Sequence, residues 1–221
     1  MTTLLIATRN AHKVGEIAAI LGPAFRYLKV RGEDNLPAVV EDAPTFAGNA
    51  VKKAETIARA LLLQSASRLP DAGEKFFVLA DDSGLEVDAL GGAPGVHSAR
   101  FAAMDSGQEG NSPDTANNAK LLRLLADVPP PRRTARFRCV LALVEVDRAV
   151  PLLTPQLFEG ACEGQIDLAP RGAGGFGYDP LFIPQGHSQS FAELGEDVKN
   201  GLSHRAKALA ELRRWFASSH G

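Results

Sequence analysis

The sequence predicts an α/β fold in one domain of 221 residues. Short apolar runs typical of strands alternate along the chain with segments whose apolar residues recur at helical spacing. No stretch of linker composition or internal repeat separates them. The length is somewhat greater than that of an average domain and too small for two large ones. We therefore expect a single domain, residues 1–221, without an independent linker.

The composition argues against several classes of protein. The formal net charge of −2 is unsuited to a broad nucleic-acid-binding face. The first apolar run lacks a preceding basic region, so no signal peptide is expected, and no apolar segment is long enough to span a bilayer. Cys139 and Cys162 lie in apolar stretches, as buried free thiols do in cytosolic proteins. We expect a soluble cytoplasmic protein that binds neither nucleic acid nor membrane.

The N-terminal part of the chain predicts a strand followed by a helix. Residues 4–7 are an apolar run, and Val14 to Leu21 carry apolar residues on one helical face. The next expected segments are a strand over 25–30, an irregular acidic stretch over 33–44, a long helix capped by Thr45, and a polar surface loop over 64–75.

The most informative stretch is the apolar run 76–80, which leads into Asp81, Asp82, Ser83 and Gly84. We expect a buried strand that ends there and presents two carboxylates at a rim, although a solvated turn is an equal alternative on local grounds. The remaining expected segments are an exposed strand over 85–89, a loop over 91–100, a helix started by Ser112-Pro113, a strand over 135–146 with a hairpin partner over 156–165, a glycine-rich loop over 172–180, a strand over 181–183 and a final helix after 203–205.

Residues 8–13 join the first strand to the first helix. A helix N-terminus with Lys13 nearby favours phosphate, but a plain connection capped by Thr8 or Asn10 remains an alternative. Lys52 and Lys53 lie in the first turns of the second long helix, where anions are preferred. That position suggests a role for one of them, besides simple solvation.

The polar residues fall into three chemical groups. Glu41, Asp42, Asp81 and Asp82 are oxygen ligands of the kind that suit Mg²⁺ or Mn²⁺, since no histidine or cysteine matches them. Ser83 has no obvious adjacent histidine, which argues against a covalent serine mechanism. The donors directed at phosphate are Thr8, Asn10, Lys13, Lys53, Lys199 and Arg205, and residues 176–179 could form a pocket for a flat ring. Together these groups favour a metal-assisted reaction on a nucleoside polyphosphate.

Six segments then carry a specific resemblance: residues 8–13, 45–50, 80–85, 95–101, 174–180 and 203–205. In this order they resemble the signature segments of the inosine/xanthosine triphosphate pyrophosphatase family, which hydrolyses deaminated purine nucleoside triphosphates. The resemblance implies a long central mixed sheet with helices, and two lobes flanking a nucleotide-binding cleft. It also implies a homodimer and dependence on Mg²⁺, with Mn²⁺ as a substitute. The implied products are the nucleoside monophosphate and pyrophosphate.

The resemblance also implies roles for individual residues. Asp82 would be the proton acceptor and a metal-site residue, with Glu41 and Asp81 as further metal-site carboxylates. Lys53 is a phosphate-directed donor and Ser83 a substrate contact. The implied phosphate contacts are Thr8, Arg9, Asn10, Ala11, His12, Lys13 and Lys199, and the implied base contacts are Phe176, Gly177, Tyr178, Asp179, His204 and Arg205.

Two residues depart from the family pattern. Arg9 stands where many members have glycine, and Gly48 stands where glutamate is expected. Two other functions stay open at this point. One is a nucleotide-binding sensor without turnover, and the other is a house-cleaning pyrophosphatase for pyrimidine or other modified nucleotides.

Overall fold

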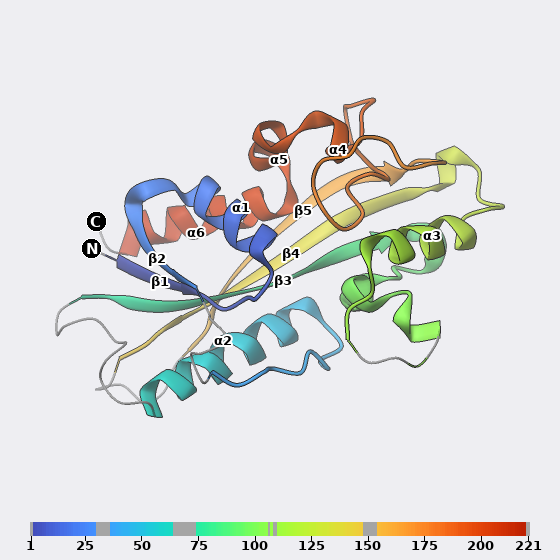
Figure 1. Cartoon of the computed structure of the whole chain (residues 1–221). Helices are drawn as coiled ribbons and strands as arrows, with labels where there is room; N and C mark the ends of the chain where they lie inside the picture. Colours follow the sequence, from blue (N-terminus) through green and yellow to red (C-terminus); the bar gives the residue numbers. More distant parts are fainter. Residues whose placement is uncertain are drawn as a thin grey trace. The chain divides into compact units, whose positions relative to one another are not determined.

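The computed structural model describes residues 2–29, 36–63, 74–105, 107, 110–147 and 154–219. Its sheet has six strands in the order β2-β1-β3-β4-β5-β6 (Figure 1). Parallel pairs join β1 to β2 and to β3, whereas β5 and β6 are antiparallel, so the predicted mixed α/β class is confirmed. The strands are β1 (Thr2–Ile6), β2 (Phe25–Lys29), β3 (Phe76–Val87), β4 (Thr134–Glu145), β5 (Gln156–Ile166) and β6 (Phe182–Pro184), and the helices are α1 (Ala11–Leu21), α2 (Phe46–Leu63), α3 (Asp114–Leu124), α4 (Phe191–Leu194), α5 (Glu196–Leu202) and α6 (His204–Ser219).

The chain forms two compact units. Unit 1 comprises Met1–Asp82, Val140–Glu159 and Ala208–Gly221, and unit 2 comprises Ser83–Cys139 and Gly160–Lys207. The boundaries fall within β3, β5 and α6 and within β4, so the units interleave along the sequence. The expectation of one domain without a linker stays a prediction.

In unit 1, helices cover both faces of the parallel strands. Helix α1 lies on one face of β1 and β2, and α2 lies on the other (Figure 1). Val14, Ile17 and Leu21 form the buried side of α1, as their helical spacing predicts. The ring of Phe216 in α6 lies 5.2 Å from that of Phe77 in β3, measured between centroids. These contacts pack α1 against the parallel strands and the C-terminal part of α6 against the start of β3.

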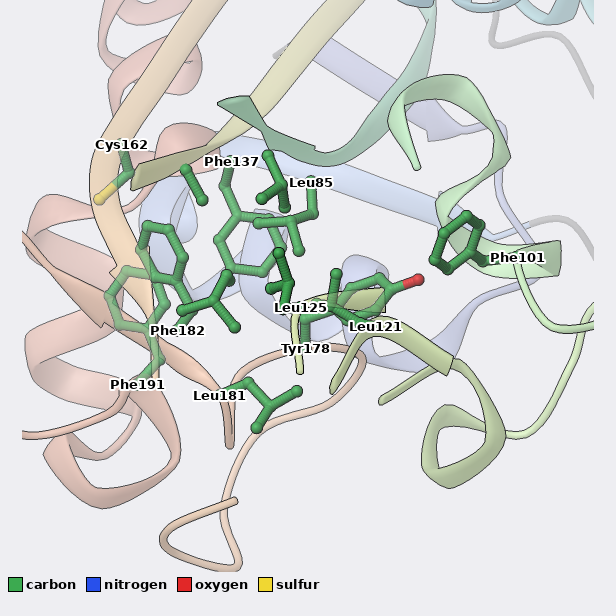
Figure 2. Packing of buried hydrophobic residues seen from close by; sticks show 13 residues of the cluster. Leu85, Phe101, Leu121, Leu125, Phe137, Cys162, Tyr178, Leu181, Phe182 and Phe191 are labelled. Atoms are coloured by element: carbon green, nitrogen blue, oxygen red, sulfur yellow. The ribbon is translucent and has the colours of Figure 1, made fainter. Parts of the chain in front are cut away.

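In unit 2, a cluster of aromatic and aliphatic side chains forms the core (Figure 2). The ring of Phe182 lies 4.7 Å from that of Phe137 and 5.2 Å from that of Phe191, measured between centroids. At Gly164 of β5 a Cβ atom would lie 2.3 Å from the carbonyl oxygen of Ile183 in β6, so this pairing requires glycine. The core thereby anchors the glycine-rich loop that precedes β6.

Both cysteines are buried free thiols, as predicted. Cys139 is 0% exposed and Cys162 is 4% exposed. Burial raises the pKa of the Cys162 thiol to about 11. The Cys162 thiol is therefore protonated near neutral pH, and both side chains are shielded from reagents in solution.

Strand β3 corrects two predictions. It runs without interruption from Phe76 to Val87, so the predicted strand end at Asp81 to Gly84 is wrong. Leu85 and Val87 are 0% exposed, so the separate exposed strand over 85–89 is also wrong. The strand can continue because lysine side chains pair with its two carboxylates, which then need not reach solvent.

Several helix signals were correct and others were not recognised. Thr45 Oγ1 accepts a hydrogen bond from Gly48 N at 3.1 Å and so caps α2 as predicted. Ser112 does not cap α3, because its hydroxyl accepts a hydrogen bond from Ala103 N and Pro113 occupies the N-cap position. Helix α4 was not predicted, although Ser190 and Glu193 form a capping box at its start.

Two further expectations concern loops and membranes. Most of the predicted polar loop over 64–75 lies outside the described residues, which resume at residue 74. Among the helices that the structure describes, none has the length and apolar character needed to cross a bilayer.

Candidate functional site

The loop over residues 8–13 forms a helix cap. Asn10 Oδ1 accepts hydrogen bonds from the backbone N–H groups of His12 and Lys13, at 3.0 and 3.2 Å. Thr8 Oγ1 accepts from Asn10 N at 3.2 Å. The capping alternative is therefore confirmed for Asn10, which engages two donors that a phosphate would otherwise use. The four residues from Arg9 to His12 are exposed, and their predicted contact with phosphate stays a prediction.

Lys13 lies against the carboxylate of Asp81. Its Nζ atom is 2.5 Å from Asp81 Oδ1, and the Asp81 side chain is 0% exposed. Asp81 and Asp82 are consecutive in a continuous strand, so their side chains leave opposite faces of β3. The structure thus assigns Asp81 a lysine partner of its own.

Lys53 of α2 is the centre of a second ion-paired group. Its Nζ atom lies 3.0 Å from Glu41 Oε1, 3.7 Å from Asp82 Oδ1 and 2.7 Å from the carbonyl oxygen of Asp81. Lys52 instead pairs with Asp42 at the surface, where both side chains are exposed. Of the two lysines in the first turns of α2, Lys53 is therefore the one directed at the acidic residues. We call Lys13, Glu41, Lys53, Asp81 and Asp82 the lysine–carboxylate cluster.

Asp82 is the residue of this cluster with the most unusual environment. Burial raises the pKa of its carboxyl to about 6, Lys53 and Lys13 oppose the rise, and Glu41 adds to it. Its Oδ2 atom is buried and has no hydrogen-bond partner among the described residues. Asn49 lies close enough to influence the pKa of Asp82, and its Nδ2 atom is likewise buried without a partner in the described part of the chain. The Asn49 amide therefore faces the Asp82 carboxylate and lowers its pKa, although the two groups do not reach standard hydrogen-bond geometry.

The carboxylates of the lysine–carboxylate cluster are candidate ligands for a metal ion. The described ranges contain no group of three histidine, cysteine, aspartate or glutamate side chains arranged to hold a metal. The predicted set of Glu41, Asp81 and Asp82 is therefore not assembled as a triad, because Asp81 leaves the opposite face of β3. Glu41 and Asp82 fit a hard cation by donor chemistry, because both are carboxylates and the buried Oδ2 atom of Asp82 accepts no hydrogen bond of standard geometry from the described residues.

In unit 2 the structure brings together Ser83 and the start of α6. Arg205 is 1% exposed, and its Nη2 atom donates a hydrogen bond to Ser83 Oγ at 2.9 Å. The guanidinium carbon lies 6.0 Å from the centroid of the Phe176 ring. His204 is buried, and its ring stacks on that of Phe137 at 4.9 Å between centroids. Two of the predicted base contacts, Phe176 and Arg205, are thus neighbours.

The glycine-rich loop is organised by Asp179 and Lys199. Asp179 Oδ2 accepts hydrogen bonds from Phe176 N at 2.9 Å and from Lys199 Nζ at 2.5 Å. Lys199 Nζ also lies 4.4 Å from the centroid of the Phe176 ring, a cation–π contact. Within unit 2 Lys199 therefore belongs with the predicted base contacts, and its predicted role at phosphate stays a prediction. We call Ser83, Phe176, Asp179, Lys199 and Arg205 the loop cluster.

Tyr178 occupies a different position from its neighbours in the loop. Its side chain is 3% exposed, lies in the core of unit 2 (Figure 2), and donates a hydrogen bond from its hydroxyl to Ser98 O at 2.9 Å. Burial raises the pKa of this hydroxyl well above its usual value. The side chain is thus an anchor for the loop, and a base contact from this residue would come from its backbone.

Three polar residues outside the predicted site contact the lysine–carboxylate cluster or the glycine-rich loop. Asn49 lies near Asp82, and Asp114 and Asn118 of α3 bind the backbone of Gly177. Asn49 belongs to a segment that carried the resemblance, so the sequence contained a signal for it. Asp114 and Asn118 lie outside those segments, and only the fold brings them to the loop.

The sequence is similar over nearly its whole length to known proteins. Residues 4–215 match the sequence profile of the Ham1 family. A dITP/XTP pyrophosphatase of Opitutus terrae is 45% identical over 219 residues, covering 96% of this chain and 97% of the relative. A dITP/XTP pyrophosphatase of Desulforamulus reducens is 47% identical over 207 residues, covering 93% of this chain and 91% of the relative. The family resemblance carried by the six segments is therefore confirmed.

Solved structures give the same result for the fold. The Ham1 protein of Staphylococcus aureus has a TM-score of 0.77 at 32% identity, with 98% of this chain and 99% of that chain covered. A HAM1 protein of Coxiella burnetii has a TM-score of 0.77 at 33% identity, with 99% and 100% covered. By sequence and by fold, the chain belongs to the Ham1 family.

Proposed function

We propose that this protein hydrolyses deaminated purine nucleoside triphosphates, ITP, dITP and XTP, to the nucleoside monophosphate and pyrophosphate. The observation that carries the proposal is the near full-length similarity to relatives named dITP/XTP pyrophosphatase. The chain also retains acidic and basic residues suited to a polyphosphate, since the lysine–carboxylate cluster places Lys13 and Lys53 beside Asp81 and Asp82. Such hydrolysis would remove non-standard nucleotides from the nucleotide pool.

Asp82 is proposed as the general base. A carboxyl whose pKa is raised to about 6 is ionised at neutral pH and is still basic enough to accept a proton from water. The attacking water would add to phosphorus as the bond to the pyrophosphate leaving group breaks.

The proposed cofactor is Mg²⁺, with Mn²⁺ as a substitute. Glu41 and Asp82 would hold it, and Asp81 would contribute through the charge balance with Lys13. When bound, a divalent cation neutralises the negative charge that develops on the phosphate oxygens. Residues 8–13 and Lys53 are proposed to hold the phosphates.

The loop cluster is proposed to recognise the base. Arg205 is a buried hydrogen-bond donor whose position is set by Ser83. Hypoxanthine and xanthine carry an oxygen at the purine 6-position that such a donor can meet, whereas adenine carries an amino group there. An unpaired buried donor costs about 1–3 kcal/mol, which disfavours adenine. His204 is proposed to line the same pocket. Lys199, which contacts Phe176 there, is proposed to hold a phosphate.

The remaining proposals concern the setting of the enzyme. We propose a single domain of two lobes with a nucleotide-binding cleft, acting as a homodimer in the cytoplasm without nucleic-acid or membrane partners. The near-neutral charge of −2 supports the absence of a nucleic-acid partner.

A product assay tests the proposal directly. The purified protein is incubated with Mg²⁺ and, separately, with ITP, dITP, XTP, GTP, ATP and dTTP. Pyrophosphate released mainly from the first three supports the proposal. Orthophosphate as the product contradicts it. A preference for dTTP would indicate an enzyme for other modified nucleotides, and binding without turnover would indicate a sensor.

A catalytic variant completes the test. We expect Asp82→Asn to lower kcat by about 10²- to 10⁴-fold, the usual contribution of a general base, while nucleotide binding stays measurable. Turnover near the wild-type value in this variant would remove Asp82 from the catalytic role.

A further inference from the structure

One helix binds both backbone polar groups of a single loop residue. Gly177 N donates a hydrogen bond to Asp114 Oδ2 at 2.6 Å, and Asn118 Nδ2 donates one to Gly177 O at 3.0 Å. Asp114 and Asn118 are four residues apart in α3 and so lie on one face of the helix. The pair therefore fixes the plane and direction of the peptide groups on either side of the Gly177 Cα atom.

The loop needs such a restraint at this residue. Gly172, Gly175 and Gly177 have φ values of +78°, +73° and +62°, so three of its residues adopt conformations that glycine favours. Glycine loses the most conformational entropy on ordering. The neighbouring residues have restraints of their own: Asp179 binds Phe176 N, and Tyr178 is anchored to Ser98. Among the hydrogen bonds of the described residues, those that Gly177 makes are both with side chains of α3.

Asn118 is poorly explained by stability alone. It is 8% exposed, and its Oδ1 atom is buried with no hydrogen-bond partner in the ranges that the structure describes. An unpaired buried oxygen destabilises the folded state, and an apolar side chain at this position would avoid that cost. The neighbouring Asn117 is different: Ala102 N donates to its Oδ1 atom and its Nδ2 atom donates to Ala99 O, so it binds another segment.

We propose that Asp114 and Asn118 are positioning residues, which hold the Gly177 backbone so that residues 176–179 present the conformation that discriminates deaminated purines from guanine. They act through the loop and are not catalytic residues. The inference rests on the proposed function, because it concerns how that function selects its base. The proposal extends the candidate site to α3, which contains none of the six segments that resemble the family.

The test uses the full chain and four variants. Asp114→Ala removes an acceptor on an exposed side chain, and Asp114→Asn keeps an oxygen there. Asn118→Leu removes the donor together with the unpaired oxygen. Asn117→Ala is the matched control, with the same residue type, helix and burial but no bond to Gly177. For each protein, kcat and KM are measured with dITP and dGTP, and the free energy of unfolding is measured in urea.

We expect Asp114→Ala and Asn118→Leu to raise the KM for dITP about tenfold, the value of one lost hydrogen bond, with kcat changed by less than about threefold. The ratio of kcat/KM for dITP to kcat/KM for dGTP should fall in both variants. Asp114→Asn should retain most of the wild-type preference for dITP. Asn117→Ala should lower the free energy of unfolding and leave that preference unchanged. Wild-type KM and preference in Asp114→Ala and Asn118→Leu would overturn the inference, as would an equal change in Asn117→Ala.

A binding measurement separates this inference from the proposed function. Calorimetry with dIMP and dGMP reports base recognition without turnover. A wild-type protein that does not hydrolyse dITP would contradict the proposed function. A preference for dIMP that is unchanged in Asp114→Ala would contradict the positioning role alone. Because Asp114 is exposed, its two variants keep the test decisive even if Asn118→Leu does not fold.

Discussion

Arg205 and Ser83 are 122 positions apart in the sequence, and a hydrogen bond of 2.9 Å joins them. Arg205 is 1% exposed, so its guanidinium has lost most of its contact with water. A buried cation is stable only when its donors have partners, and Ser83 Oγ is one of them. Ser83 therefore orients Arg205, the residue that we propose donates a hydrogen bond to the base.

Ser83→Ala tests this orientation. The loss of a hydrogen bond to a charged group should lower kcat/KM for dITP about tenfold. Ser83→Thr is the matched control, since it keeps the hydroxyl and should retain most of the activity. Equal activity in Ser83→Ala and wild type would show that other contacts suffice to orient Arg205.

The raised pKa of Asp82 predicts a stability change with pH. The folded state binds the Asp82 proton more tightly than the unfolded state, because its pKa rises from 3.8 to about 6. The contribution of Asp82 is therefore neutral below about pH 4 and destabilising above about pH 6, by about 3 kcal/mol. In metal-free buffer, Asp82→Asn should be more stable than wild type at pH 7.5 and equally stable at pH 4. Urea unfolding at both pH values measures the difference, and equal stability at pH 7.5 would contradict the expected burial cost.

Lys53→Met tests the charge balance around Asp82. Lys53 opposes the rise in the pKa of Asp82, so its removal should raise that pKa further. The acid limb of the kcat/KM profile should then move to higher pH, because a higher pH is needed to ionise the base. Lys52→Met is the matched control on the same helix, since Lys52 pairs with the exposed Asp42. An unshifted limb in Lys53→Met would contradict the prediction.

Tyr178→Phe separates an anchor from a base contact. The variant loses the hydrogen bond to Ser98 O and should reduce the free energy of unfolding by about 1–2 kcal/mol. Because the side chain lies in the core, the KM for dITP should stay within about twofold of wild type once the protein is folded. A large rise in KM with unchanged stability would instead assign the hydroxyl to the substrate.

The sequence predicted the fold class and family well because these depend on local patterns. Helical spacing located α1, and Thr45 located the start of α2. The predicted end of β3 was wrong, because two adjacent carboxylates are typical of a solvated turn unless partners are known that let them be buried. Those partners, Lys13 and Lys53, lie 68 and 29 positions away from Asp81 and Asp82 and become neighbours only in the folded chain.

The candidate site shows the same division. Residues inside the family segments could be named in advance, and Asp82, Arg205 and Phe176 do lie in the two clusters. Lys53, which was named from its place near a helix N-terminus, lies there as well. The sequence does not determine which way a side chain points. Tyr178 is predicted to contact the base, whereas its side chain lies in the core of unit 2. The contacts of Asp114 and Asn118 with Gly177 follow from the fold of unit 2, and no local pattern announces them.

The two buried thiols have a practical consequence. With Cys139 and Cys162 at 0% and 4% exposure, and the pKa of Cys162 raised to about 11, maleimide reagents should leave the native protein unmodified. A cysteine introduced at the exposed residue Ala173, which already carries a Cβ atom, would then be the sole target for a fluorescent or spin label. The glycine-rich loop can therefore be labelled site-specifically for spectroscopy without first replacing a native cysteine.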